Sequence, residues 1–326
     1  MDQMSETILV TGGAGFIGFH TSKKLLELGK NIIIIDNFND YYNVKLKEDR
    51  IAQLPKKNLK VYNEDIADFK AISRIIKKNP ITKICHLAAQ AGVRYSLKNP
   101  FIYERSNVLG TLNILEVAKQ SGIKDFVLAS SSSVYGNNKK IPFSEKDNVD
   151  NPISFYAATK KSAELIAHTY SHLYDINCTA LRFFTVYGPW GRPDMSYYKF
   201  TQAITEGKKI LVYNYGKMKR DFTFIEDAVP AIITALERPF KYEIFNIGNS
   251  KPIELNYFIE VLENTLGKTA EKELMEDQQG DVKQTFADIS KAKKMLNYKP
   301  KTSISEGLKE FVEWYKKYKV NSNKYK

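Results

Sequence analysis

The stretch ILVTGGAGFIGFHTSKKLLELGKNIIIID, residues 8–36, decides the expected fold. It starts as an apolar strand-like run, turns through a glycine-rich segment, continues as a helical pattern that stops at Gly29, and ends in a second apolar run. Gly12 permits a sharp turn, Gly15 lets the backbone approach a pyrophosphate, and Gly18 allows a helix to pack closely on a sheet. The N-terminus of the helix would then face the phosphates. This order of elements predicts a unit that binds a dinucleotide.

The spacing of these glycines is one residue longer than in the usual dinucleotide fingerprint, so the glycines alone would also fit an ordinary loop. Their context favours binding, because a strand precedes them, a helix follows, and Asp36 closes the next strand. A carboxylate at that position accepts hydrogen bonds from adenosine ribose hydroxyls and repels a 2′-phosphate, which favours NAD over NADP. Asp65 is a weaker candidate for the adenine edge. The small residues of LAAQAGVRYS, from Leu87, suit a backbone that lies against a cofactor.

Apolar runs alternate with amphipathic helical patterns from the start of the chain, which predicts a parallel sheet with helices on both faces. The expected fold class is α/β, a Rossmann-type doubly wound parallel sheet with a smaller mixed α/β domain toward the C-terminus. We expect strands over Ile8 to Thr11, Asn31 to Asp36, Lys60 to Glu64, Lys83 to Ala88, Asp125 to Ser130 and Asn177 to Phe184. We expect long helices over Pro100 to Ser121 and Phe155 to Tyr174.

The composition changes after Phe184, where TVYGPWGRPDMSYYKF is dense in glycine, proline and aromatic residues. This composition indicates an excursion out of the sheet. We expect residues 1–186 and 222–248 to form the NAD-binding domain, and residues 187–221 and 249–320 to form the substrate domain. The segment EIFNIGNS would return one strand to the main sheet, and residues 321–326 would form a polar tail.

A second set of residues has the pattern of a device that moves a proton. SSSSVYG ends the fifth predicted strand, and YAATK places Tyr156 and Lys160 one helical turn apart on the same face. A phenol titrates near ~10 in water, so it acts as a base at neutral pH only where a cation and a hydrogen-bond donor stabilise its anion. Lys160 is the candidate cation and Ser131 the candidate donor. A lone pair at this spacing is usually plain helix surface, so the assignment depends on the rest of the chain.

Sheet topology connects the two sets of residues. Ligands of open α/β sheets bind beyond the carboxyl ends of the strands, so Ser131 reaches the same edge as Gly12 and Asp36. We therefore expect one site that holds both the dinucleotide and the proton-transfer residues.

Composition and charge exclude several other classes. Of the 326 residues, 43% are hydrophobic and 26% charged, which is ordinary for a globular enzyme. The net charge of +12 would suit nucleic acid, but the lysines are scattered doublets separated by acids, so we expect no nucleic-acid partner. No apolar run approaches the ~20 residues of a membrane helix, and the N-terminus has no secretory pattern. We expect no membrane association and a cytoplasmic location.

Cysteines and histidines suggest no additional site. Cys85 and Cys178 fall inside apolar runs, where buried free thiols are expected rather than a disulfide. His168 and His172 are one helical turn apart, but no glutamate follows His168 and no third ligand suggests itself. The sequence therefore predicts no metal site.

Together these residues resemble the extended short-chain dehydrogenase/reductase family, in particular its nucleotide-sugar epimerases. The resemblance covers nearly the whole chain. It rests on the order and spacing of TGGAGFIG, Asp36, Asp65, LAAQAGVR, NVLGT around Asn107, SSSSVYG, Tyr156 with Lys160, RFFTVYGP, RDFTFIEDA, FNIGNS and GDVKQTFADISKA. It implies a tightly held NAD, a UDP-sugar substrate and a homodimer formed through the two long helices.

The resemblance also implies roles for individual residues. Tyr156 would remove the proton of the sugar 4-hydroxyl while the C4 hydride passes to NAD, and the resulting 4-keto sugar would turn and receive the hydride on its other face. Ser131 would bridge the hydroxyl and Tyr156, and Lys160 would hold the nicotinamide ribose. The implied cofactor contacts are Gly12, Gly15, Phe16, Ile17, Gly18, Asp36, Asn37, Asp65, Ile66, Leu87, Ala88, Ala89, Gln90, Asn107, Ser130, Tyr156 and Lys160. The implied substrate contacts are Arg94, Ser131, Ser132, Ser133, Thr185, Arg192, Arg220 for the diphosphate, and Asp281 for the nucleotide.

The residues after Ser131 distinguish between related reactions. Enzymes of this family that eliminate water carry an Asp-Glu pair there, and uronate decarboxylases carry a glutamate at the second position, whereas this chain has Ser132 and Ser133. Elimination needs an acid and a base that these serines do not provide. LAAQAGVRYS and VYGPWGRPDM look most like UDP-glucuronate 4-epimerases. Arg192 with the two serines would receive the C6 carboxylate, with Arg94 as a less certain helper. The alternative for Arg192 is a structural salt bridge between the domains.

Other substrates and functions stay open. The family stretch Pro-Gly-Asp is Gln279-Gly280-Asp281 here, and Thr285 falls where the family sets room for an N-acetyl group on C2. UDP-glucose and UDP-N-acetylglucosamine are therefore alternative substrates. Remoter alternatives are a UDP-glucuronate decarboxylase and a non-catalytic dinucleotide-binding or RNA-associated protein of the same fold. The presence of Ser131, Tyr156 and Lys160 argues against the non-catalytic alternative.

Overall fold

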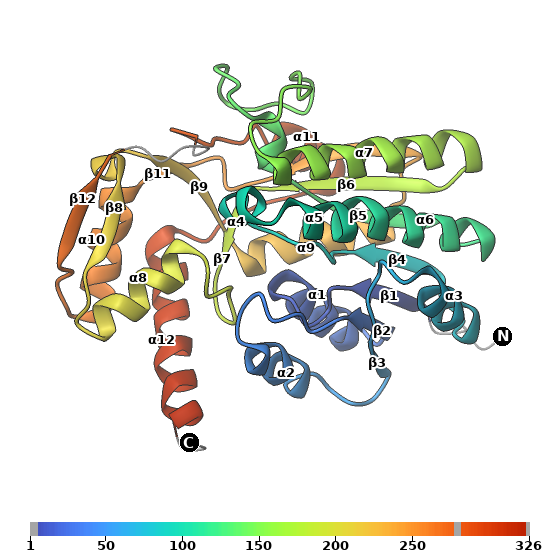
Figure 1. Cartoon of the computed structure of the whole chain (residues 1–326), viewed down its shortest axis with the longest axis horizontal. Helices are drawn as coiled ribbons and strands as arrows, with labels where there is room; N and C mark the ends of the chain where they lie inside the picture. The colour runs from blue at the N-terminus through green and yellow to red at the C-terminus, as the bar shows by residue number, and fades with distance from the viewer. Residues whose placement is uncertain (1–5, 277–281, 324–326) are drawn as a thin grey trace.

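The computed structural model describes residues 6–276 and 282–323, and its centre is a seven-stranded sheet (Figure 1). All neighbouring strands run parallel, in the order β10-β6-β5-β4-β1-β2-β3. The strands are β1 (Thr7–Thr11), β2 (Asn31–Asp36), β3 (Leu59–Asn63), β4 (Lys83–His86), β5 (Asp125–Ser131), β6 (Asn177–Phe183) and β10 (Tyr242–Ile247). The predicted doubly wound parallel sheet is confirmed, and the segment EIFNIGNS does return a strand to it.

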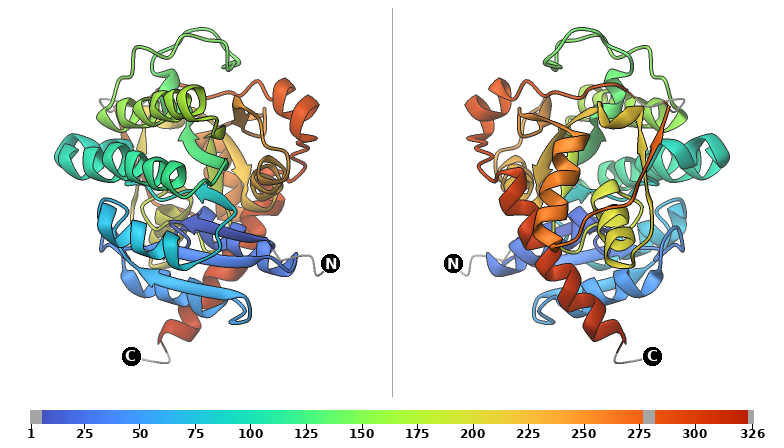
Figure 2. Two further views of the ribbon diagram at one scale, coloured as in Figure 1. Left: turned by 90° about the vertical axis from the view of Figure 1, so that its right-hand side faces the viewer. Right: turned by 90° about the vertical axis from the view of Figure 1, so that its left-hand side faces the viewer.

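Helices cover both faces of this sheet, as Figure 2 shows end-on. One face carries α3 (Phe69–Lys78), α6 (Gly110–Gln120) and α7 (Phe155–Tyr174), and the other carries α1 (Phe16–Glu27) and α9 (Ile225–Glu237). The sequence NIIIID of β2 reflects this arrangement. Ile32 and Ile34 belong to the apolar cluster on one face, and Ile33 and Ile35 to the cluster on the other. A strand buried on both faces reads as a continuous apolar run.

The second part of the chain adds two small sheets beside the large one. One contains β11 (Pro252–Glu254), β9 (Lys219–Phe224) and β7 (Thr185–Tyr187), and the other pairs β12 (Lys272–Met275) with β8 (Ile210–Tyr213). Around them lie α8 (Ser196–Thr205), α10 (Leu255–Leu266), α11 (Ser290–Leu296) and the C-terminal α12 (Ile304–Asn323). A single apolar cluster runs from β1 and β2 through to Phe258 and Phe311, so the two parts share a core. The domain boundaries given above stay a prediction.

The helix predicted over Pro100 to Ser121 is divided into three pieces. A short α5 (Pro100–Tyr103) follows α4 (Val93–Lys98), a π-helical segment occupies Glu104–Leu109, and α6 continues from Gly110. Helical periodicity in a sequence does not reveal such an insertion, because the apolar face resumes after it. The helix predicted over Phe155 to Tyr174 matches α7 in both bounds.

Strand β4 ends at His86, two residues before the predicted end. The next backbone groups still contact β1, since the Leu87 amide donates to the Thr11 carbonyl and the Ala88 amide donates to the Thr11 hydroxyl. The chain then leaves the sheet toward the site described below. Cys85 and Cys178 are buried free thiols, as predicted. None of the helices within residues 6–276 and 282–323 combines the length and apolar character of a membrane span.

Candidate active site

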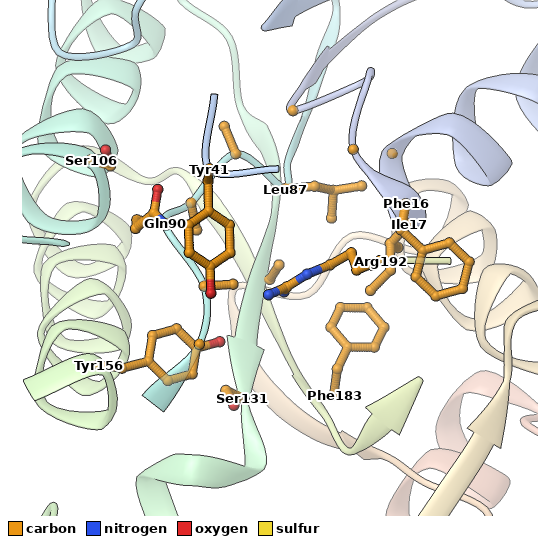
Figure 3. Close-up of a pocket in the computed structure, with 18 of the residues that line it drawn as sticks. Phe16, Ile17, Tyr41, Leu87, Gln90, Ser106, Ser131, Tyr156, Phe183 and Arg192 are labelled. Carbon is orange, nitrogen blue, oxygen red and sulfur yellow. The ribbon is translucent and has the colours of Figure 1, made fainter. Parts of the chain in front are cut away.

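A pocket of about 410 Å³ lies along the carboxyl ends of the central strands (Figure 3). Its walls come from the glycine-rich turn after β1, the end of β2, the segment after β4, the serines that end β5, the start of α7 and the segment after β6. Parallel strands deliver all these segments to one edge of the sheet. Of the predicted cofactor contacts, all except Asn107 line this pocket, and so do the predicted catalytic residues.

The glycine-rich turn is closely packed on one side and open on the other. Gly12 has a φ of +70°, and a Cβ on it would lie 2.7 Å from the backbone nitrogen of Ala88. A Cβ on Gly18 would lie 2.1 Å from the Gly12 carbonyl oxygen, so helix α1 is packed against the turn itself rather than only against the sheet. Gly15 lines the pocket, and a Cβ there would meet, within 4 Å, only the Gly12 carbonyl group. This open side leaves room for a phosphate to approach the backbone.

Asp36 lies buried at the end of β2, where its carboxylate has two backbone partners. The Ala14 amide donates to one carboxylate oxygen over 3.1 Å, and the Phe38 amide donates to the other over 2.9 Å. A carboxylate can accept about four hydrogen bonds, so acceptor capacity is left for ribose hydroxyls. Asp65 is less deeply placed, and it accepts from the Ala67 amide and pairs with Arg105 at 3.1 Å.

Ser131, Tyr156 and Lys160 meet beyond the end of β5, with Tyr156 and Ser131 facing the same space in Figure 3. Burial raises the pKa of Tyr156, while a hydrogen bond with Ser131 and the positive charge of Arg192 act in the opposite direction without outweighing it. Burial lowers the pKa of Lys160 to about 8, although Glu164 partly opposes this shift. Of these two groups, only Lys160 therefore has a pKa shifted toward neutrality in this structure, while the pKa of Tyr156 is shifted away from it.

The contacts of Lys160 differ from the prediction that its ammonium group is the cation that stabilises the Tyr156 anion. Its ammonium group donates to the Ala129 carbonyl of β5 over 2.9 Å. The cation whose charge lowers the pKa of Tyr156 is Arg192. Lys160 still lines the pocket, and its ammonium has further N–H donors to offer a ligand. The predicted role of Lys160 toward a cofactor ribose stays a prediction.

Asn107 positions other residues instead of lining the pocket. It lies in the π-helical segment, where its side chain accepts from the Gln90 amide over 2.8 Å and donates to the Gln90 carbonyl over 3.0 Å. The same side chain donates to the Thr159 hydroxyl, which in turn donates to the Tyr156 carbonyl. π-helical turns often mark functional sites because they redirect a side chain. Here Asn107 ties a pocket wall to the helix that carries Tyr156.

Gln90 has an amide group available to a ligand. Its side chain is buried and lines the pocket, and within the described parts of the chain its Nε2 has no hydrogen-bond partner of ordinary geometry. The Tyr103 hydroxyl lies near enough for Gln90 to act on its pKa, but it donates to the Ala91 and Gly92 carbonyls. Buried amide donors are normally satisfied. A bound molecule in the pocket would supply the acceptor, in agreement with the prediction that Gln90 contacts the cofactor.

A buried ion pair between Glu164 and Arg182 contacts the serine-rich end of β5. Glu164 accepts from both the Nε and the Nη2 of Arg182 over 2.8 Å, and Ser130 donates to Glu164 over 2.6 Å. Arg182 also donates to the Tyr135 hydroxyl over 3.0 Å. Sequence reasoning missed this pair. The signal available was a glutamate four residues after Lys160, on the inward face of the same helix.

Arg192 reaches across the pocket from the segment after β7, with its guanidinium directed toward Tyr41 and Tyr156 (Figure 3). Ser132, Ser133 and Thr185, predicted with it as substrate contacts, line the same pocket. Arg192 also forms a salt bridge with Asp194 at 2.6 Å. Both interpretations offered above are therefore compatible with the structure, since one guanidinium lines the site and makes a structural ion pair.

The segment that carries Arg192 is fastened to the glycine-rich turn by Arg50. This fully buried guanidinium, from α2 (Val44–Ala52), donates to the Trp190 carbonyl over 2.7 Å, to the Gly191 carbonyl over 3.2 Å and to the Ala14 carbonyl over 3.0 Å. Arginine suits this task because its planar fork serves several carbonyls at once. Sequence reasoning missed Arg50, because nothing in its local sequence distinguishes it from a surface arginine on a helix.

Three predicted substrate contacts are not placed at the pocket. Arg94 lies over the ring of Tyr213, 5.1 Å from its centroid, and Arg220 donates to the Lys219 carbonyl on an exposed part of β9. Neither is among the described residues that line the pocket. Asp281 lies outside the described residues. Their predicted contacts with a substrate stay predictions. The pocket also has aromatic and apolar lining that sequence reasoning missed, in Tyr41, Tyr42, Val93, Phe183 and Met195.

Comparison with known proteins gives one family throughout. Residues 9–311 match the model of the family described as GDP-mannose 4,6 dehydratase. An uncharacterised protein of Methanocaldococcus jannaschii is 55% identical over 313 residues, which are 95% of this chain and 96% of that protein. The UDP-glucuronate 4-epimerase of Thermodesulfobacterium geofontis is 50% identical over 310 residues, or 94% of this chain and 95% of that protein.

A solved structure is similar over almost the full length. It is the UDP-glucuronic acid 4-epimerase of Bacillus cereus in complex with UDP-glucuronic acid and NAD. The TM-score is 0.90 and the sequence identity 36%, with 96% of this chain and 99% of that chain covered. The architecture described above is thus shared with a known enzyme structure.

Proposed function

This chain belongs to the GDP-mannose 4,6-dehydratase family of extended short-chain dehydrogenase/reductases, and on that premise we propose that it is an NAD-dependent UDP-sugar 4-epimerase, an isomerase. The specific reaction that we propose is the interconversion of UDP-glucuronate and UDP-galacturonate through a 4-keto sugar. The observation that carries this choice is the position of Arg192, whose guanidinium shares one pocket with Tyr156 and the serines after β5.

The residues present suit NAD. Gly15 leaves its backbone open to a phosphate, Asp36 keeps acceptor capacity for ribose hydroxyls, and Gln90 offers an unpaired buried amide donor within the described chain. Lys160 would donate to the nicotinamide ribose. Bound NAD supplies the hydride acceptor and donor for C4 of the sugar. A carboxylate at Asp36 disfavours a 2′-phosphate, so NAD is preferred to NADP.

Tyr156 moves the proton in the proposed reaction. As a phenolate it takes the proton of the sugar 4-hydroxyl. As a phenol it returns that proton after the keto sugar has rotated in the pocket to present its other face. A hydrogen bond between Ser131 and the Tyr156 oxygen helps to keep the sugar hydroxyl and the phenol in line. Burial disfavours the phenolate of Tyr156. The positive charge of Arg192 favours it and so partly offsets the effect of burial.

The serines after β5 favour epimerisation over elimination. Ser132 and Ser133 stand where a dehydratase needs an acid and a base, and both line the pocket. Their hydroxyls can instead donate to a C6 carboxylate, together with the guanidinium fork of Arg192. Oxidation at C4 turns glucuronate into a β-keto acid, which loses carbon dioxide easily unless its carboxylate is held. The Arg192 guanidinium and the two serine hydroxyls would therefore both recognise the C6 carboxylate and protect it from loss as carbon dioxide.

The test is a comparison of substrates. Purified protein is incubated separately with UDP-glucuronate, UDP-glucose and UDP-N-acetylglucosamine, and the C4 epimers are separated by chromatography. We expect UDP-galacturonate from the first substrate and little product from the other two, with NAD released on denaturation. Turnover of UDP-glucose or of UDP-N-acetylglucosamine in preference to UDP-glucuronate would reassign the substrate. Absence of all epimers would refute the epimerase.

We also propose a cytoplasmic homodimer. Support for the dimer comes from apolar side chains that are exposed on α4, α5, α6 and α7, namely Leu97, Phe101, Leu112, Phe155, Leu165 and Leu173. Exposed apolar patches of this kind commonly mark protein interfaces. All of them except Leu97, which lies on α4, belong to the two segments through which the sequence predicted dimerisation, Pro100 to Ser121 and Phe155 to Tyr174.

A further inference from the structure

The guanidinium of Arg192 has two usable edges, and the protein itself occupies one of them. Nε donates to one oxygen of Asp194 over 3.0 Å, and Nη2 donates to the other over 2.6 Å. This is a bidentate pair, the geometry in which an arginine and a carboxylate fit best. A guanidinium has five N–H donors, so the edge formed by Nη1 and Nη2 keeps donors for a second carboxylate.

Asp194 is itself held in place from the other side of the pocket. The Tyr41 hydroxyl donates to Asp194 over 3.3 Å. Tyr41 belongs to the loop between β2 and α2, which starts after Asp36 and also lines the pocket. Its ring packs on Tyr95, with the ring centroids 5.0 Å apart. The chain of contacts Tyr41, Asp194, Arg192 therefore runs from a fixed aromatic ring to the pocket.

The charges in this chain of contacts are well matched. Asp194 and Arg192 are each about one-fifth exposed. Burial acts to raise the pKa of Asp194, but the neighbouring charge and hydrogen bonds of Arg192 outweigh burial and lower that pKa. Asp194 is therefore ionised at neutral pH, and Arg192 enters any complex with a partner already in place.

We infer that Asp194, held by Tyr41, is a positioning residue that fixes Arg192 with its second edge toward the substrate and thereby decides whether the keto intermediate of a uronate keeps its carboxylate. This inference rests on the proposed function. Asp194 contacts Arg192 rather than the sugar, and it is not among the described residues that line the pocket. Its effect is exerted through the orientation of the guanidinium.

The reaction that this arrangement prevents can be written out. In the 4-keto uronate the C5–C6 bond would break, its electron pair would move toward the C4 carbonyl to give an enolate, and carbon dioxide would leave. C5 would take up a proton from solvent to give a 4-keto pentose, which becomes a pentose when C4 takes back the hydride first removed from it and its oxygen takes back the proton. The C5–C6 bond breaks readily only when it is aligned with the carbonyl π system. A carboxylate held by two parallel N–H donors has a fixed direction, whereas one held by a rotating side chain does not.

The experiment measures how turnover is divided between two products. Asp194→Asn and Asp194→Ala are compared with wild type on UDP-glucuronate, and UDP-galacturonate and UDP-pentose products are quantified from the same reaction. We expect the ratio of pentose to galacturonate to rise about tenfold in Asp194→Ala and by a smaller factor in Asp194→Asn, which keeps the shape and one acceptor. Tyr41→Phe, which removes only the outer hydrogen bond, should raise the ratio less than either.

A matched control is available elsewhere in the chain. The Tyr318 hydroxyl donates to Asp49 over 2.9 Å, so Tyr318→Phe removes a bond of the same kind at a place outside the pocket lining. We expect its product ratio to equal that of wild type. A loss of stability alone lowers both products together and leaves their ratio unchanged. If the ratio is unchanged in both Asp194 variants, Asp194 has no positioning role.

A binding measurement separates this inference from the proposed function. Calorimetric titration with UDP-glucuronate and UDP-glucose, carried out in the Tyr156→Phe background so that turnover is suppressed, gives the preference for the carboxylate. Preorganisation of Arg192 predicts that Asp194→Ala lowers this preference by about threefold to tenfold, because the side chain must then be ordered on binding. A wild-type enzyme that forms no UDP-galacturonate would refute the proposed function, while an unchanged preference in Asp194→Ala would refute the inference.

Discussion

At the scale of single residues, the site places its acid and base in an environment that disfavours charge. Lys160 is buried and Tyr156 is half-buried, and removal from solvent raises the pKa of the phenol and lowers that of the ammonium. Charges and donors around them must therefore stabilise the phenolate. Arg192 is the cation that acts on Tyr156 in this structure, so the side chain proposed to bind the substrate carboxylate also acts on the proposed base.

The first prediction concerns Tyr156. Tyr156→Phe removes the oxygen that exchanges the proton and should lower kcat by about 10²-fold or more. Product formation from UDP-glucuronate at saturating concentration measures this loss. Tyr95→Phe is the control, since it also removes a hydroxyl from an aromatic residue beside the pocket. Equal activity of Tyr156→Phe and wild type would contradict the mechanism.

The second prediction is a pH dependence that arises from Lys160. Its pKa is lowered from 10.5 to about 8, so the ammonium loses its proton as the pH rises through about 8. The deprotonated amine no longer provides a charged donor, and kcat/KM should fall above that pH. Lys160→Arg keeps its charge to far higher pH, so its profile should lack this alkaline decline. A decline at the same pH in the arginine variant would assign it to another group.

The third prediction concerns Arg192. Arg192→Ala removes the fork proposed to bind the C6 carboxylate and leaves Asp194 without its charged partner. We expect kcat/KM for UDP-glucuronate to fall on the order of 10²-fold and pentose product to appear. Arg192→Lys retains the charge but not the paired donors, so its loss should be intermediate. Kinetics like those of wild type in Arg192→Ala would remove this residue from the site.

At the scale of elements, the π-helical segment connects two walls of the pocket. It interrupts what would otherwise be one long helix and turns the Asn107 side chain inward, where it makes three hydrogen bonds with two residues, Gln90 and Thr159. The benefit lies in position rather than in helix stability, because the segment replaces regular helical hydrogen bonds. It keeps Gln90 and the first turns of α7 in a fixed relation.

The fourth prediction tests that connection. Asn107→Ala leaves buried groups of Gln90 and Thr159 without partners, so the free energy of unfolding should fall by about 2–3 kcal/mol and kcat should also fall. Asn79→Ala is the control, because Asn79 is also a buried asparagine, lies at the end of α3 outside the pocket lining, and donates to the Ile75 carbonyl. Urea unfolding and kcat are measured for both variants. We expect a loss of stability in both and a loss of kcat only in Asn107→Ala. A loss of stability with unchanged kcat in Asn107→Ala would make Asn107 purely structural.

Much at these two scales follows from the sequence, and the reasons are physical. Continuous apolar runs such as NIIIID predict buried parallel strands, and parallel strands bring their ends to one edge, so most of the pocket lining follows from the order of the motifs along the chain. Partners that are distant in sequence could not be predicted. Arg50 with Gly191, Glu164 with Arg182, and Tyr41 with Asp194 form only when segments far apart are folded together.

At the scale of the whole molecule, the two parts of the chain are one packed body as far as the structure describes it. The apolar cluster that begins under the large sheet continues through Phe222 and Phe258 to Phe311 on α12. The C-terminal helix also contacts the first part directly, because the Tyr318 hydroxyl of α12 donates to the Asp49 carboxylate of α2 over 2.9 Å. This shared core packs the two parts of the chain closely against each other.

The fifth prediction concerns assembly. If the exposed apolar side chains of α4 to α7 form an interface, gel filtration should give about twice the chain mass of 37.4 kDa. Phe101→Glu with Leu165→Glu should give the monomer mass, because both side chains are well exposed, at 82% and 55%. Leu274→Glu is the control, since Leu274 is 57% exposed on β12, away from these helices. A wild-type mass near that of one chain would contradict the dimer.

The anchoring of the Arg192 segment by Arg50 has a consequence for redesign. One guanidinium holds the carbonyl groups of that segment and the glycine-rich turn together, while the redox residues lie on other segments. Arg50 is thus a main attachment of residues 188–194, beside the ring contacts of Trp190 and the hydrogen bond between Tyr41 and Asp194. Exchange of this segment among relatives that use different sugars offers a route to new specificities, provided that Arg50, the backbone carbonyls it binds and these other contacts are retained.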